Sequence, residues 1–297
     1  MVKKLKKYSR AKCTAYWASA AKEGNLDVIK WLHANDIKGC NVHTMALAAR
    51  GGHLNVVQWL HANRTEGCAA AAITFAFAFA SEKGKLKVVQ WLHTNSVVNC
   101  TTDVMNCAAR DNRIKVVKWL HANRTEGCTT NAMDLASAKG HLKMVQWLIA
   151  NRTEGCSSKA LKSAASGGHF EVVKLIHEKY PKMRSQDAII FAAMNGHLEI
   201  VKWLHNNDTK GCTTEAMDLA ACHGHLETVQ WLHENRTEGC TVDAMDGACE
   251  DGHLEIIKWL HKNRTEGCTA KAMDFAVDEG HLEVVQWLKE NVEMFKN

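Results

Sequence analysis

The sequence predicts an all-α fold, a helical repeat solenoid of about ten stacked helix–turn–helix units. The main evidence is a tryptophan that recurs every 28 residues, with one step of 32 residues between Trp59 and Trp91 and with Leu175 in place of one tryptophan. A glycine or asparagine turn precedes each of these positions, from Gly24 to Gly280. The hexapeptide NRTEGC occurs five times, first at residues 63–68. Self-similarity at a fixed period of this length is the signature of a repeat array.

Residues 212–239, CTTEAMDLAACHGHLETVQWLHENRTEG, show how the first helix of a unit is predicted. Thr213 lies in a position that holds Asn, Thr or Ser in seven other units, so we predict the N-cap there. Met217, Ala220 and Ala221 then fall on one face at helical spacing. Gly224 ends the helix.

The second helix is predicted over residues 225–235, with Leu226, Val229 and Leu232 facing the first helix. Asn235 suits a C-terminal cap in the left-handed region, and Gly239 supports the turn into the next unit. NRTEGC is therefore interpreted as the joint between units. Its Asn-x-Thr pattern is also a glycan acceptor, but glycosylation requires secretion and the sequence has no apparent signal peptide.

Segments such as HLEVVQWL at residues 281–288 and HLEIVKWL at 197–204 resemble the ankyrin repeat, over about residues 13–292. The resemblance implies stacked helix pairs that act as a protein-interaction module. Two departures matter. EAMD at residues 215–218 stands where ankyrin units usually have Thr-Pro-Leu-His, and the 28-residue period is shorter than the ankyrin period of about 33. We expect units without the β-hairpin finger, as in the short repeats of oomycetes, amoebae and large DNA viruses.

Composition and charge narrow the class of protein. The 297 residues are 46% hydrophobic and 23% charged, with no apolar run of the roughly 18 residues that a membrane helix needs. Residues 1–12 carry six basic and no acidic side chains, and the rest holds 31 basic and 32 acidic residues. We therefore predict a basic N-terminal segment over residues 1–12 and a single continuous array over residues 13–297, without a footprint for nucleic acid.

The repeated cysteines are not expected to form disulfides or bind zinc. Equivalent atoms of stacked helices lie roughly 8–10 Å apart, whereas a disulfide needs Cα atoms within about 7 Å, and no Cys-x-x-Cys pair is present. We predict reduced, semi-buried thiols in a cytoplasmic or nuclear protein. Eight of the 12 cysteines hold one position per unit: Cys40, Cys68, Cys100, Cys128, Cys156, Cys212, Cys240 and Cys268.

The repeated histidines, tryptophans and aspartates are likewise interpreted as structural. Most of the 17 histidines either follow the turn glycine or follow the Trp-Leu pair, one per unit each. This regularity favours hydrogen bonds at helix ends and between units over a metal site. The tryptophans are expected to pack at the seam between units. Asp134, Asp218, Asp246 and Asp274 stand one per unit, so they form no acid–base pair. No catalytic motif is found, and we expect no enzyme activity, metal or cofactor.

Two irregular segments depart from the pattern. Residues 69–84, AAAAITFAFAFASEKG, contain the four extra residues, which predicts a first helix one turn longer. Phe77 and Ala80 align with buried positions, which leaves Phe75 or Phe79 near the surface as a hydrophobic anchor for a partner. The alternative is that the extra turn folds over its own phenylalanines. Residues 177–190 hold the only proline, Pro181, and are either a partner-contacting loop or a decayed repeat.

The pair of residues before each turn glycine also varies, from basic to acidic along the chain. Such a gradient suits an extended protein partner, although solvated, drifting surface positions explain it equally well. Together with the phenylalanines, these positions give the candidate partner-binding residues: Arg50, Phe75, Phe79, Arg110, Lys139, Met194, His223, Glu250, Asp251, Asp278 and Glu279.

The functional prediction is a non-catalytic scaffold or adaptor that binds a protein partner through the concave, first-helix face of the array. The partner's identity is unknown, and we expect neither a small-molecule substrate nor sequence-specific nucleic-acid binding. A monomer is expected, with end-to-end association of copies as the alternative. The alternative function is a tether to an anionic membrane or nucleic acid through residues 1–12, which predicts binding sensitive to salt.

Overall fold

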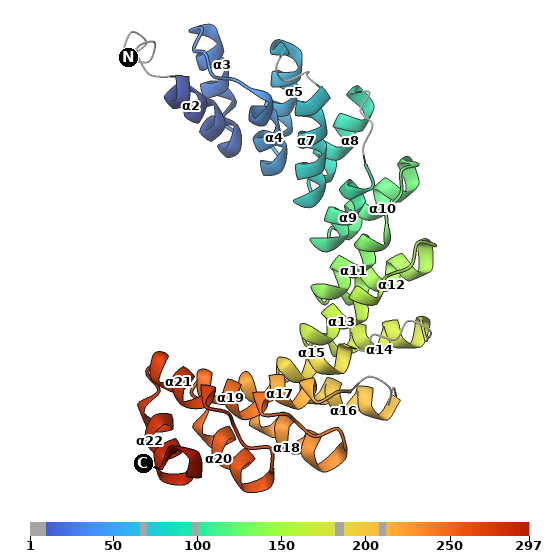
Figure 1. The fold of residues 1–297 in the computed structure, drawn as a ribbon. Helices are drawn as coiled ribbons and strands as arrows, with labels where there is room; N and C mark the ends of the chain where they lie inside the picture. Colours follow the sequence, from blue (N-terminus) through green and yellow to red (C-terminus); the bar gives the residue numbers. More distant parts are fainter. Residues whose placement is uncertain (1–9, 66–69, 97–100, 182–186, 208–211, 297) are drawn as a thin grey trace. The chain divides into compact units, whose positions relative to one another are not determined.

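The computed structural model describes residues 10–65, 70–96, 101–181, 187–207 and 212–296 (Figure 1). Within these ranges the chain forms ten consecutive helix pairs and a short 3-10 helix, η1 (Glu293–Phe295), and no strand. Most of residues 1–12 therefore lies outside the described part. The chain divides into two compact units, unit 1 (residues 1–136 and 143–155) and unit 2 (residues 137–142 and 156–297).

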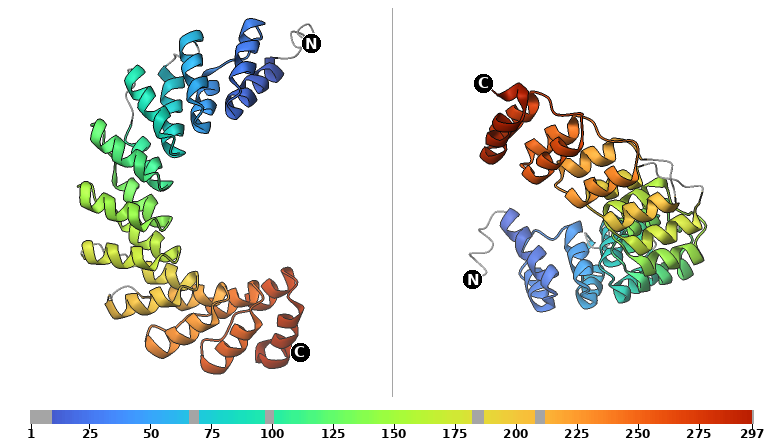
Figure 2. Two further views of the ribbon diagram at one scale, coloured as in Figure 1. Left: turned by 180° about the vertical axis from the view of Figure 1, so that it is seen from behind. Right: turned by 90° about the horizontal axis from the view of Figure 1, so that it is seen from below.

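In unit 1 the first helix of each pair packs on the first helix of the next, and the second helices form an adjacent layer (Figures 1 and 2). Its pairs are α2 (Arg10–Glu23) with α3 (Leu26–Ala34), α4 (Val42–Gly51) with α5 (Leu54–Asn63), α7 (Ala70–Glu82) with α8 (Leu86–Asn95), α9 (Asp103–Arg110) with α10 (Ile114–Asn123), and α11 (Thr130–Ala138) with α12 (Leu142–Asn151). The last residues of α11 and the first of α12 belong to unit 2.

Unit 2 repeats this two-layer arrangement (Figure 2). Its pairs are α13 (Ser158–Ser166) with α14 (Phe170–Lys179), α15 (Ala188–Met194) with α16 (Leu198–Asn207), α17 (Glu215–Cys222) with α18 (Leu226–Asn235), α19 (Asp243–Glu250) with α20 (Leu254–Asn263), and α21 (Lys271–Asp278) with α22 (Leu282–Asn291).

The core lies between the two layers, as the spacing of apolar residues predicts. Met217, Ala220 and Ala221 are buried in α17, and Val229 and Leu232 are buried in α18, whereas Leu226 is half-buried. Small residues allow the first helices to approach closely. A Cβ atom added to Gly247 in α19 would lie 3.0 Å from the Cβ of Cys222 in α17. Burial of these apolar side chains is the main force that holds the layers together.

The helix boundaries confirm most of the predicted capping. The turn glycines are left-handed, and Asn112 adopts the same conformation with φ 57°. Asn41 and Ser157 are N-caps whose side chains accept a hydrogen bond from the amide two residues on. Thr241 and Thr269 make the same bond, at 3.1 and 3.2 Å, although regular helix begins one residue later. The predicted N-cap at Thr213 is wrong by one residue, because α17 begins at Glu215 and its N-cap is Thr214, whose side chain makes no capping hydrogen bond.

The prediction of a left-handed cap at Asn235 is wrong. Asn235 is the last residue of α18, and the chain leaves the helix directly into extended backbone at Arg236, with φ −129°. The asparagine instead caps with its side chain, because its Nδ2 donates to the Trp231 carbonyl at 2.9 Å. The same bond recurs at 2.8–2.9 Å in the eight other repeats that have Trp-x-x-x-Asn at the end of the second helix. The left-handed residue of the joint is the glycine, as predicted for Gly239 (φ 75°).

Both irregular segments keep the helix pair. Helix α7 has 13 residues against 10 in α4 and 8 in α9, which confirms the predicted extra turn. Phe77 and Ala80 are buried, whereas Phe75 is 42% exposed, so the extra turn does not enclose all of its phenylalanines. In the other segment α14 and α15 form at the expected positions. Residues 182–186, which follow Pro181, lie outside the described residues, so the choice between a binding loop and a decayed repeat stays open.

Candidate functional site: the first-helix face

Eight of the ten tryptophans contact the histidine of the preceding helix pair, within the same compact unit. The rings meet edge to face, with centroids 5.1–5.3 Å apart and interplanar angles of 81–86°. This geometry is favoured between the edge of one ring and the face of another. The predicted packing of the tryptophans between repeats is therefore confirmed. The histidines were predicted only to form hydrogen bonds, and their ring contacts with the tryptophans are an additional role. The pairs are His33–Trp59, His61–Trp91, His93–Trp119, His121–Trp147, His177–Trp203, His205–Trp231, His233–Trp259 and His261–Trp287.

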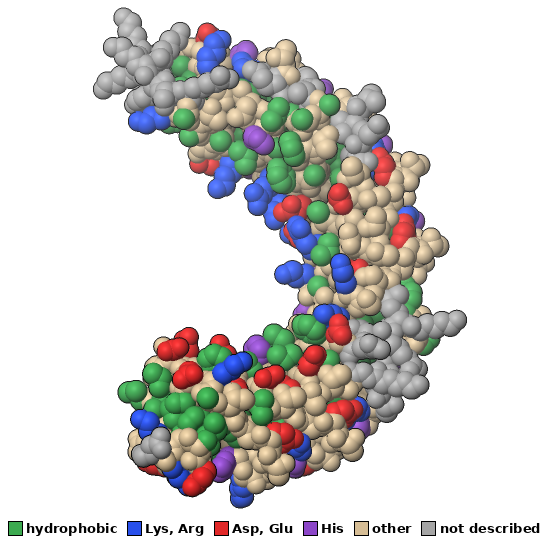
Figure 3. Space-filling model, in the orientation of Figure 1, with side chains coloured by type: hydrophobic (Ala, Val, Ile, Leu, Met, Phe, Trp, Pro, Cys, Tyr) green, Lys and Arg blue, Asp and Glu red, His purple; other side chains and the backbone are tan. Residues whose placement is uncertain are grey.

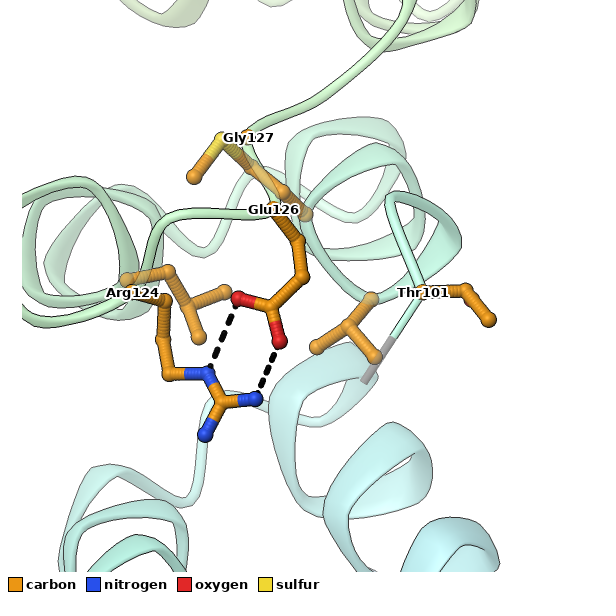
Figure 4. Close-up of a pocket in the computed structure, with 7 residues that line it drawn as sticks. Thr101, Arg124, Glu126 and Gly127 are labelled. Atoms are coloured by element: carbon orange, nitrogen blue, oxygen red, sulfur yellow. Dashed lines mark hydrogen bonds and ion pairs between the residues drawn. The ribbon is translucent and has the colours of Figure 1, made fainter. Parts of the chain in front are cut away.

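The arginine of the NRTEGC joint bridges successive repeats. Arg124 donates from Nε to Oε2 of Glu126 at 3.1 Å and from Nη2 to Oε1, so the pair is bidentate (Figure 4). Its Nη1 also donates to Nδ1 of His93, 3.2 Å away in the preceding pair. Arg152, Arg236 and Arg264 repeat this pattern. The hollow beside Arg124 measures about 10 Å³, room for roughly one water molecule.

The histidine after the turn glycine also joins neighbouring repeats. Nε2 of His53 donates to the Lys22 carbonyl at 2.9 Å, and equivalent bonds join His169, His197 and His281 to carbonyls 31 residues earlier. The ring covers the turn glycine of the preceding repeat, because a Cβ on Gly196 would lie 2.4 Å from Nδ1 of His225. Burial lowers the pKa of His225, which keeps this imidazole neutral.

The repeated aspartates bind the start of the next first helix. Asp218 accepts hydrogen bonds from the amide of Thr241 at 2.7 Å and from its hydroxyl at 3.0 Å, and Asp246 holds Thr269 in the same way. In one repeat Asn106 takes this place and bonds Thr129. No disulfide joins the cysteines that the structure describes, and burial raises the pKa of Cys240 and Cys268 to about 11. No group of three metal-ligating side chains occurs in the described ranges.

The repeated polar residues thus connect repeats, and the candidate binding surface lies elsewhere. We define the first-helix face as the positions nine, five and two residues before each turn glycine, or before Asn112 in α9. Spacings of four and three residues place these positions on one side of a helix. Apolar side chains predominate at the middle position, where they are half-buried or exposed: Leu47, Phe79, Cys107 and Leu135 in unit 1, and Phe191, Leu219 and Phe275 in unit 2.

Sequence reasoning missed most of this apolar row. Leu47, Leu135, Phe191, Leu219 and Phe275 were not among the predicted binding residues. The signal was present, because each lies three residues before the variable pair and so shares its side of the helix. The repeat consensus concealed it, since a leucine in a regular position is read as core. In the structure Leu135 is 36% exposed.

The predicted binding residues lie at the rim of this face and differ between the units. In unit 1 Arg50 is exposed, whereas Arg110 forms ion pairs with Asp111 at 2.9 Å and Glu82 at 3.7 Å. In unit 2 the acidic side chains gather over α19 and α21 (Figure 3). Among the unit 2 candidates Met194 is half-buried, and the others are exposed: Lys139, His223, Glu250, Asp251, Asp278 and Glu279. Phe75 and Phe79, the remaining candidates, lie on α7 in unit 1.

Ten helix pairs in the described part of the chain, stacked through side chains that recur once per repeat, define a helical repeat protein. Residues 161–246 match the family model for ankyrin repeats in three copies, and residues 18–61, 105–149, 136–177 and 245–288 match the model for ankyrin repeats in many copies. The chain therefore belongs to the ankyrin-repeat family, whose members are typically non-catalytic protein-interaction modules. No curated protein matches it. No helix in the described part of the chain is long and apolar enough to cross a membrane.

Proposed function

We propose that this chain is a non-catalytic scaffold that binds a protein partner through its first-helix face, the face expected to be concave. The observation that carries the proposal is the row of partly exposed apolar side chains bordered by residues that vary from repeat to repeat. Apolar anchors with a charged rim are the usual composition of a protein interface. A surface that served only to stack repeats would need no apolar side chains exposed to water.

The test is capture of partners from cell lysate by the full chain, with the recovered proteins identified and quantified. Leu135→Asp and Leu219→Asp place a charge on the first-helix face. Val28→Asp in α3 and Leu282→Asp in α22 place the same charge at exposed sites on second helices, 38% and 77% exposed, and serve as matched controls. We expect the first two variants to lose the partner and the controls to retain it. Equal loss in all four, or in none, contradicts the proposal.

The tether alternative is separated in the same experiment. An interface of apolar anchors largely survives deletion of residues 1–12 and a rise in salt. Attachment through six basic side chains is abolished by both, because the release of counterions dominates such binding. Capture that disappears under both conditions identifies the N-terminal segment as the binding part. We also propose that the chain acts as a monomer, and light scattering after size-exclusion chromatography distinguishes it from end-to-end association.

A further inference from the structure

Helix α7 carries a row of aromatic rings on the first-helix face of unit 1. The Phe75 ring lies 5.7 Å from the His43 ring of α4, at 34°, and 6.4 Å from the Phe79 ring, at 21°. Arg50 of α4 places its guanidinium over the Phe79 ring, 5.7 Å from the centroid. We call these four residues the aromatic patch. Hydrophobic side chains gather over α4 and α7 with a histidine and basic side chains beside them (Figure 3).

The charge of the aromatic patch is unbalanced at one residue. At the C-terminal ends of α7 and α9, two basic and two acidic side chains form a network of ion pairs of 2.7–3.7 Å, so their charges balance. They are Lys83, Arg110, Glu82 and Asp111. Arg50 has no acidic partner among the described residues. Its guanidinium lies over the Phe79 ring, and an anion beside it would complete the patch.

These features select one class of ligand. A cationic ligand is repelled by Arg50, which already occupies the face of Phe79. A nucleic-acid strand needs a positive groove along its backbone, whereas Glu82, Asp103 and Asp111 line this side of α7 and α9. An apolar side chain packed on Phe75 and His43, with a carboxylate that reaches Arg50, satisfies both the rings and the charge. The Phe75 and Phe79 rings lie 6.4 Å apart, and the Arg50 guanidinium lies 5.7 Å from the Phe79 ring. Both distances are close to the spacing of about 7 Å between residues on the same side of an extended chain.

We propose that the aromatic patch binds a protein segment in which an apolar residue is followed, or preceded, by Asp or Glu two to four positions away. This inference rests on the proposed function and specifies its partner. Phe75 is the anchor point and Arg50 selects the charge of the ligand. A peptide that satisfies only one of the two residues binds weakly, because hot spots of an interface act within a small desolvated region.

The test is selection of a random peptide library, displayed on phage, against the full chain and against three variants. Enriched peptides are then synthesised with a fluorescent label and titrated. We expect apolar residues paired with Asp or Glu, and affinity at least about tenfold lower for Phe75→Ser. Val28→Ser, at an exposed site on the second helix α3 of the same unit and outside the first-helix face, is the matched control and retains affinity. Selection against Arg50→Glu is expected to replace Asp and Glu by Lys and Arg.

Several results overturn the inference. They are a failure to enrich any peptide over the Phe75→Ser chain, peptides without an acidic preference, or an unchanged preference after Arg50→Glu. Binding of labelled oligothymidylate that is lost in Phe75→Ser assigns the patch to nucleic acid. Because Phe75 and Arg50 are exposed, both variants should fold, and circular dichroism checks this. If peptide binding is lost only in Phe191→Ser, a variant in unit 2, the peptides bind the first-helix face outside the aromatic patch, which refutes this inference. The proposed function is decided separately, by the lysate experiment.

Discussion

At the scale of single residues, histidine and tryptophan behave as one pair. Eight of the described edge-to-face contacts join a histidine to the tryptophan of the following repeat. The sequence changes both partners together, since Leu175 replaces the tryptophan one repeat after Ile149 replaces the histidine. The two positions therefore depend on each other, which a packing role explains and an independent chemical role does not.

A double-mutant cycle measures this dependence. We expect His233→Ile and Trp259→Leu each to lower the free energy of unfolding, and the double variant to lose about 0.5–1.5 kcal/mol less than the sum. The loss of the bond from Arg264 to His233 affects both arms of the cycle and cancels. His233→Ile combined with Trp287→Leu is the control, because Trp287 contacts His261 instead. Additive losses for the contacting pair, measured by urea unfolding, contradict the prediction.

A buried hydroxyl gives a second prediction at this scale. Ser81 in α7 is fully buried, and its Oγ has no hydrogen-bond partner among the described residues. The equivalent position in α9 is Ala109, also fully buried. Ser81→Ala should stabilise the chain by about 1 kcal/mol, because an unsatisfied buried donor costs roughly 1–3 kcal/mol. Ala109→Ser should destabilise it similarly. A lower urea midpoint for Ser81→Ala would show that the hydroxyl is satisfied in solution.

At the scale of helices and turns, the sequence predicts nearly everything that recurs. A period of 28 residues locates both helices and the left-handed glycines, because burial and backbone sterics act alike in each repeat. The failure at Asn235 has a local cause. An asparagine at a helix end has two ways to cap, in the left-handed conformation or through its side chain, and the extended arginine that follows decides for the second.

The binding face was harder to predict than the fold. The exposed charges before the turn glycine were found because they vary, whereas Leu219 or Phe191 look like core residues in the sequence. Which side of a first helix faces water depends on the neighbouring repeats, since Ala216 and Ala220 of α17 are buried by contacts along the stack. The pairing of Arg110 with Glu82 likewise depends on how α9 packs against α7, and the sequence alone does not give it.

The histidine bonds between repeats predict a pH dependence. Burial, followed in size by the charge of His223, lowers the pKa of His225 in the folded chain below its ordinary value near 6.5. The unfolded chain then binds more protons near pH 6, so the stability contributed by a neutral His225 is present above about pH 6.5 and is lost as the pH falls through the folded pKa. We expect unfolding free energy to fall between pH 7.5 and 5.5, and less steeply in His225→Asn.

Asparagine is chosen for this variant because Asn25 occupies the same position after the turn in the first repeat. There its side-chain oxygen accepts a hydrogen bond from the amide of Val28. Urea unfolding of both proteins at several pH values gives the two slopes. Parallel curves would show that His225 binds protons equally in the folded and unfolded chains. The thiols of Cys222, Cys240 and Cys268 do not contribute in this range, since burial raises their pKa to about 11.

At the scale of the whole molecule, each repeat is held only by its neighbours. The hydrogen bonds between repeats join residues 23, 25, 29 or 31 positions apart, and every one described joins neighbouring repeats. Stability in such a stack is approximately a sum of repeat and nearest-neighbour terms. A defect in one repeat should therefore open its neighbours first, and distant repeats should keep their protection.

Two matched variants test this. Leu232 in α18 and Leu92 in α8 occupy the same position in different units and are 1% and 0% exposed. Replacement of either by alanine should cost about 2–5 kcal/mol locally. Amide hydrogen exchange should then rise in α17–α20 for Leu232→Ala, with α4–α8 unchanged, and the reverse should hold for Leu92→Ala. If amide hydrogen exchange instead rises uniformly along the chain in both variants, the array unfolds as one cooperative body. A partner bound at one repeat would then stabilise all repeats equally.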